Sequence, residues 1–149
     1  MIEDKQIIDF LQRKGALEIL VEIGYKPKRH TDLREKLLMS SSTIHERLTK
    51  GMQLELWTQS LEQQQPTGVS AKVYELTDLG REVWDAAKKE DLRRYHMVRR
   101  DAVREVRNAE NNVLREVSPR DAEWWDQIDS EIETEHFETQ TRISDFLTE

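Results

Sequence analysis

Residues 31–57 read TDLREKLLMSSSTIHERLTKGMQLELW, and this stretch decides which fold to expect. It predicts two short helices joined by a tight turn. Thr31 is expected to cap the first helix, because a threonine side chain can accept a hydrogen bond from a free backbone N–H. Leu33 and Leu37 fall four residues apart and therefore share one buried face of this helix.

Met39 and Ser40 are expected to form the turn, and Ser40 to cap a second helix over residues 40–54. Ile44 and Leu48 form the buried stripe of this second helix. The remaining side chains are polar and are expected on or near its exposed side: Ser41, Ser42, Thr43, His45 and Glu46, flanked by Arg47 and Lys50. Hydroxyl groups at an exposed helix N-terminus suit close approach to phosphates and base edges, as in a helix-turn-helix.

Four segments around this stretch carry a wider resemblance: LQRKGALEILVEIG, KRHTDLREKL, SSSTIHERL and KVYELTDLGREV. In order and spacing they resemble the winged helix-turn-helix transcriptional regulators of the HxlR, MarR and ArsR type. The resemblance covers residues 11–85, and its most specific part is YELTDLGRE at residues 74–82. It implies a mainly α (α+β winged helix) fold, with a DNA-binding domain at residues 1–85 and a helical dimerisation region at residues 86–149.

The chain departs from that family pattern at two positions of the second helix. Regulators of this type usually have Leu where this chain has Gly51, and Gly where it has Glu55. We expect Met52 or Leu54 to replace the missing leucine contact. Glu55 argues against the left-handed turn that usually precedes the wing.

The other expected elements follow from local patterns. Helices are predicted at residues 2–13 and 16–23, the second ended by Gly24, and a short edge strand at residues 28–30. Wing strands are predicted at residues 56–60 and 72–76, around a turn with Pro66 and Gly68. The expected wing tip carries no Lys or Arg, only these polar residues: Gln63, Gln64, Gln65, Thr67 and Ser70.

A long helix is predicted to start at Asp78, capped by Thr77, and to run without a breaker to Pro119, with a bend along its length as the alternative. Its apolar residues repeat every 3.67 positions on average, near the period of a straight helix: Tyr95, Val98, Ala102, Val106, Ala109, Val113 and Val117. Its arginines are interpreted as a solvated face or as ion-pair partners of the acidic tail, with DNA contact as the alternative: Arg93, Arg94, Arg99, Arg100, Arg104 and Arg107.

A last helix is expected after a cap at Ser118 and Pro119, returning antiparallel along the long helix to about Leu147. A long apolar stripe needs a partner, because an isolated helix gains little stability in water. We therefore expect a homodimer through residues 86–149, in a coiled-coil-like pairing. Packing within the monomer is the alternative.

Charge is distributed unevenly along the 149 residues, whose net charge is −7. Residues 26–50 hold seven Lys and Arg against three Asp and Glu, whereas residues 110–149 hold three against twelve. A basic region on an acidic protein can still bind DNA, since salt screens distant charges beyond about 10 Å. The high acid content, much of it in the tail, and the excess of Arg over Lys are typical of a halophilic source. Without cysteine or an apolar run of membrane length, we expect a cytoplasmic protein without disulfides.

The expected function is a dimeric regulator that inserts its recognition helices into successive major grooves of an inverted repeat, about 34 Å apart. Ser41, Ser42, Thr43 and His45 are the candidate base contacts, and Glu46 could accept from cytosine N4 or repel non-specific DNA. The candidate phosphate contacts are Arg29, His30, Arg47, Lys50 and Lys72.

The alternatives are a winged-helix protein-interaction module that uses the acidic tail, and an architectural DNA binder indifferent to sequence. An enzyme, a bound cofactor and a metal site are not expected, because no nucleophile–base pair, phosphate loop or ligand spacing occurs. A small-molecule effector between the winged helix and the dimer helices remains open, and no residue identifies one.

Overall fold

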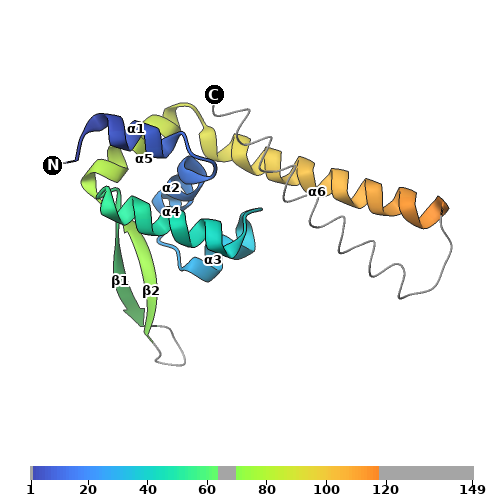
Figure 1. Ribbon diagram of the computed structural model, residues 1–149, viewed down its shortest axis with the longest axis horizontal. Coiled ribbons are helices and arrows are strands. Elements are labelled where there is room, and N and C mark those ends of the chain that lie inside the picture. Colours follow the sequence, from blue (N-terminus) through green and yellow to red (C-terminus); the bar gives the residue numbers. More distant parts are fainter. Residues whose placement is uncertain (1, 64–69, 118–149) are drawn as a thin grey trace.

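The computed structural model describes residues 2–63 and 70–117, and these form six helices and one antiparallel pair of strands (Figure 1). The mainly α expectation is confirmed at this level. The elements are α1 Asp4–Leu11, α2 Ala16–Tyr25, α3 His30–Lys36, α4 Ser41–Gln53, β1 Trp57–Gln63, β2 Ser70–Leu76, α5 Asp78–Lys89 and α6 Leu92–Val117. The predicted last helix and the wing tip from residue 64 to 69 lie outside the described residues.

Helix α2 is the centre of the core and is almost entirely buried. It begins after Gly15, whose φ of 80° belongs to the left-handed region that glycine adopts without strain. The prediction that Gly24 ends this helix is wrong, since α2 continues to Tyr25. Gly24 instead makes room for α5, because a Cβ at this position would overlap the indole of Trp84.

Helices α3 and α4 form the expected pair, but the start of α3 differs from the prediction. Thr31 lies inside the helix, and Arg29 holds the N-cap position because its backbone N–H donates to Oδ2 of Asp32 over 2.9 Å. Ser40 caps α4 as predicted, accepting from the N–H of Thr43 over 3.2 Å. Ile44 is fully buried, as the apolar stripe required.

Helix α4 ends in a left-handed turn at Glu55, whose φ is 61°, so the argument against that turn is wrong. The N–H of Glu55 donates to Met52 and the N–H of Leu56 to Gly51, which satisfies two carbonyls of the last turn. The indole of Trp57 packs directly against Gly51, and a Cβ at position 51 would overlap this indole. The Trp57 indole N–H also donates to the carbonyl of Leu48 over 2.9 Å, so the indole fills the place of the missing leucine.

Strands β1 and β2 form a hairpin that is longer than predicted and pairs Trp57 with Leu76 at its base. Only a single bridge, between Lys28 and Tyr74, replaces the edge strand expected at residues 28–30, because His30 already belongs to α3. After β2, the Thr77 hydroxyl accepts from the N–H of Gly80 and caps α5 as predicted.

The prediction of one continuous helix from Asp78 is wrong, and the alternative of a bend is closer, because the segment is divided into α5 and α6 at Asp91. Asp91 has a φ of 54° and its side chain pairs with Nε of Arg94 over 2.6 Å. This break lets α5 pack on α2 while α6 takes a different direction and projects away from the other helices (Figure 1). The domain boundary expected after residue 85 lies within α5.

Candidate nucleic-acid interface

Helix α4 has one buried face and one polar face. Ile44, Leu48 and Gly51 are buried, while the opposite side presents polar groups to solvent. Of the predicted base contacts, Ser42 and His45 are exposed together with Glu46, and Ser41 and Thr43 are half-buried.

The same face extends further along α4 than the predicted residues. Ser42, Glu46, Thr49 and Gln53 follow one another at steps of four, three and four, which aligns them on one side of the helix. Gln53 is exposed and Thr49 half-buried, and neither was among the candidates. Helical periodicity from Ser42 would have identified both.

Hydroxyl groups cluster at the N-terminus of α4. The Ser40 hydroxyl donates to the Thr43 hydroxyl over 2.8 Å and lies 3.3 Å from that of Ser42. Free backbone N–H groups and the helix dipole make such an end favourable for an anion. This end of α4 can therefore position a phosphate, with the hydroxyl groups as additional donors.

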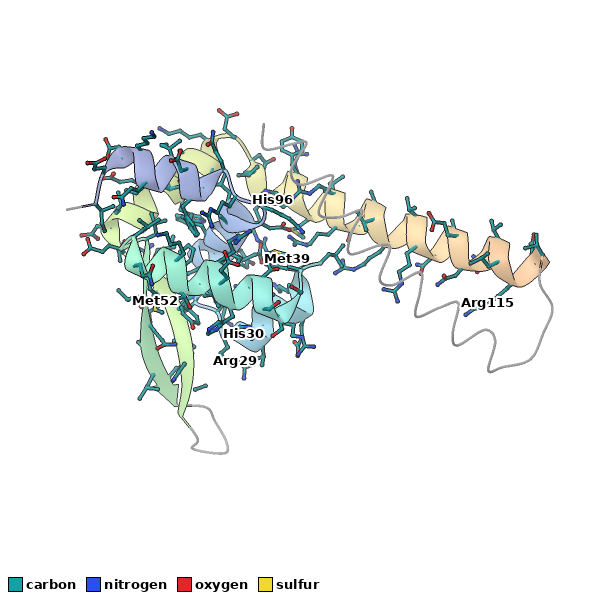
Figure 2. The ribbon with its side chains drawn as sticks, in the orientation of Figure 1. Arg29, His30, Met39, Met52, His96 and Arg115 are labelled. Atoms are coloured by element: carbon teal, nitrogen blue, oxygen red, sulfur yellow. The ribbon has the colours of Figure 1, made fainter. Side chains whose placement is uncertain are left out.

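The predicted phosphate contacts at the start of α3, labelled in Figure 2, form hydrogen bonds within the fold. Arg29 donates two hydrogen bonds to the carboxylate of Asp32, at 2.8 and 3.2 Å, and these hold the pKa of Asp32 below its ordinary value. Nε2 of His30 lies 3.3 Å from the carbonyl oxygen of Ser41 and joins α3 to the first turn of α4. His30 thus orients the helix pair, whereas Arg29 caps α3 and remains partly exposed.

Arg47 is also engaged inside the fold, since its Nε donates to the carbonyl of Lys14 over 2.9 Å. Its side chain is only 13% exposed and pairs with Glu46, which lies 3.5 Å from Arg13 as well. Arg47 therefore positions α4 against the loop between α1 and α2. That loop brings Arg13 and Lys14 close to the polar face of α4, and sequence patterns did not select either residue.

The last two predicted phosphate contacts occupy separate places. Lys50 is half-buried in the last turns of α4, and Lys72 is exposed on β2, where it pairs with Leu61 of β1. The structure thus brings Ser41, Ser42, Thr43, His45 and Glu46 together on α4. Lys72 belongs to the hairpin.

Three arginines assigned to a solvated face or to the tail instead bind α2, so that interpretation is wrong for them. Glu18 of α2 accepts from Arg99 and Arg100, and Glu22 accepts from Arg93 over 2.9 Å. We call these five residues, with His96, the α2–α6 junction. Figure 2 places His96 where α6 leaves the other helices. Burial lowers the pKa of His96.

A polar cavity of about 370 Å³ lies between the end of α2, α3 and the hairpin. Lys28 lines it, and burial lowers the pKa of this lysine while its Nζ donates to the carbonyls of Glu22 and Lys26. A cavity of about 140 Å³ lies among α2, α5 and α6, where the sequence left room for an effector. No three potential metal ligands are grouped within residues 2–63 and 70–117, and no helix described there could span a membrane.

Comparison with known proteins finds no match for this chain among family models, curated proteins or solved structures.

Proposed function

We propose that this protein is a DNA-binding transcriptional regulator in which α3, α4 and the β1–β2 hairpin act as a winged helix-turn-helix. The observation that carries the proposal is the polar face of α4, which begins at a hydroxyl-capped N-terminus and lies opposite a fully buried stripe. A helix about 10–12 Å in diameter fits a major groove of similar width.

In this proposal, α4 reads base edges and its neighbours hold the DNA backbone. Ser42 and Gln53 are the candidate readers, because a hydroxyl pairs with several bases and an amide can pair bidentately with adenine. Glu46 suits the N4 amino group of cytosine. Arg13 and Lys50 flank this face and are the candidate phosphate contacts beside it, with Lys72 on the hairpin.

Arg29, His30 and Arg47 receive a more limited role than the sequence suggested. The hydrogen bonds from His30 to Ser41 and from Arg47 to Lys14 support a role in positioning α4, and phosphate contact by Arg29 would compete with its bond to Asp32. A homodimer would supply the second recognition helix that an inverted repeat requires.

The proposal is tested by selecting duplex DNA from a random pool and measuring the affinity of selected and bulk DNA at several salt concentrations. We expect enrichment of an inverted repeat. Lys50→Ala should lower the slope of log affinity against log salt by about one, while Lys89→Ala on α5 should leave it unchanged. Gln53→Ala should relax selectivity at one base pair, by about 1–3 kcal/mol.

Two results would contradict the proposal. Uniform, steeply salt-dependent binding without enrichment would indicate the architectural alternative. Absence of binding at every salt concentration would leave the protein-interaction alternative.

A further inference from the structure

The outer face of α6 is apolar along its whole length. Its large side chains are between 50% and 68% exposed, and two exposed alanines lie among them. We call this the α6 stripe: Tyr95, Val98, Ala102, Val106, Ala109, Val113 and Val117. An apolar surface of this extent usually marks an interaction site.

The α6 stripe is distinct from the face by which α6 is attached to the other helices. His96, Arg100 and Val103 are buried in that attachment and lie roughly a third of a turn away around the helix. Beyond Arg104, which donates to the carbonyl of Lys36, α6 continues away from the other helices (Figure 1). The stripe therefore does not belong to the core, and α6 needs a further partner to bury it.

We infer that the α6 stripe is the contact surface for a second copy of this chain, in an antiparallel pair with Val106 on the two-fold axis. The five central positions, from Val98 to Val113, read Val–Ala–Val–Ala–Val in either direction. In an antiparallel pair Ala102 faces Ala109 of the partner subunit, and Val98 faces Val113 of the partner subunit. Alanine opposite alanine lets the backbones approach, and a self-complementary patch is what a two-fold interface requires.

The positions of the arginines on α6 and the area of the α6 stripe favour a second copy of the chain as the occupant of the stripe, and not the chain's own acidic tail. Arg100 and Arg104 lie well away from the stripe around the helix, and Arg99, at its edge, is paired with Glu18 of α2, so attraction would not bring an acidic segment onto the valines. Helix α6 is about 39 Å long at 1.5 Å per residue. Seven side chains from each copy would bury on the order of 1,000 Å², the lower range for a specific interface.

The inferred interface deepens the proposed function. The interface itself is argued from α6, and only the binding of the dimer to an inverted repeat rests on the proposed function. It is tested on the full chain without DNA, by sedimentation velocity of wild type, Val106→Glu and Asn108→Glu. The two variants add the same charge two residues apart, and Asn108 is exposed on the far side of α6. We expect a wild-type dimer at micromolar concentration, a dissociation constant at least 100-fold higher for Val106→Glu, and no change for Asn108→Glu.

A milder variant distinguishes loss of the interface from misfolding, because truncating a half-exposed valine has little effect on the stability of the monomer. Val106→Ala should raise the dimer dissociation constant about tenfold, since each dimer loses two packed side chains. A monomeric wild type would overturn the inference and favour the tail as occupant. Equal dimerisation of wild type and all three variants would overturn it too.

Orientation is tested by cross-linking, since the natural chain has no cysteine. Val106→Cys should form a disulfide dimer on oxidation, whereas Asn108→Cys should not. Val98→Cys should cross-link to Val113→Cys when the two variants are mixed, and neither should cross-link with itself. Self-linked Val98→Cys would overturn the antiparallel arrangement.

The DNA experiment separates the two proposals. If Val106→Glu abolishes the dimer and wild type binds no DNA, the interface stands and the proposed function fails. If wild type binds an inverted repeat and Val106→Glu remains a dimer, the proposed function stands and the interface fails.

Discussion

Glu55 holds a left-handed conformation that usually belongs to glycine, at the turn between α4 and β1. The left-handed region costs a residue with a side chain about 1–2 kcal/mol. The turn persists because its N–H groups satisfy two carbonyls of α4 and because the Thr77 hydroxyl donates to the carbonyl of Glu55 over 2.6 Å. The turn therefore places Trp57, the first residue of β1, against Leu48 and Gly51 of α4.

We predict that Glu55→Gly raises the free energy of unfolding by about 0.5–1 kcal/mol, because relief of strain exceeds the added freedom of the unfolded chain. Urea denaturation at fixed protein concentration measures this. Gln53→Gly, two residues earlier in the last turn of α4, should lower the same quantity by about 1 kcal/mol. A loss of stability in Glu55→Gly would show that the turn is not strained.

At the scale of elements, the α2–α6 junction fixes the direction in which α6 leaves the other helices. Glu18 and Glu22 are almost completely buried, and removal of one partner from a buried ion pair leaves the other charge uncompensated. Lys36 of α3 also lies 3.7 Å from Glu22, so this carboxylate contacts both α3 and α6. The junction thus connects the candidate DNA-reading pair to the candidate dimer helix.

We predict that the free energy of unfolding falls as the pH drops through 6.5, the ordinary pKa of histidine, because of His96. Burial lowers its folded pKa below the ordinary 6.5, so between these two values the unfolded chain binds more protons and acid favours unfolding. The contribution is fully present above pH 6.5 and is lost as the pH falls toward the folded pKa. Asp32, whose folded pKa is lowered by its hydrogen bonds from Arg29, loses its stabilising contribution only as the pH falls through its ordinary value of 3.8, well below the range in which His96 acts.

Thermal unfolding at fixed protein concentration across this pH range measures the effect. His96→Gln should reduce the dependence of the melting temperature on pH. His45→Gln, at an exposed position, should retain the wild-type dependence. An unchanged slope in His96→Gln would assign the effect to another group.

At the scale of the molecule, the proposed pairing makes the outer half of α6 dependent on association for its stability. We predict that the melting temperature rises with protein concentration. The apparent free energy of unfolding of a dimer increases by about 2.7 kcal/mol for a 100-fold increase in concentration, by mass action. Differential scanning calorimetry over this range measures the rise. Val106→Glu should melt at one temperature at all concentrations. The same behaviour in wild type would contradict dimerisation.

Local sequence determined the elements whose stabilising contacts lie within a few residues. The cap at Ser40 and the cap at Thr77 were predictable, because each hydroxyl bonds an N–H three positions later. The buried residues of α4, Ile44 and Leu48, followed from helical spacing alone. On the candidate site, the same spacing correctly placed Ser42, His45 and Glu46 on the exposed side.

Tertiary structure decided the features that depend on partners far apart in the chain. Glu18 and Glu22 bind arginines between 71 and 82 positions away, and no local pattern distinguishes a buried carboxylate from a solvated one. Gly24 looked like a helix end because the tryptophan that occupies its space comes from another helix. Arg47 was predicted to be available for a phosphate because its acceptor, the carbonyl of Lys14, is 33 positions away in the chain. Periodicity reports which side of an element is apolar, and only the packed fold decides which charges meet.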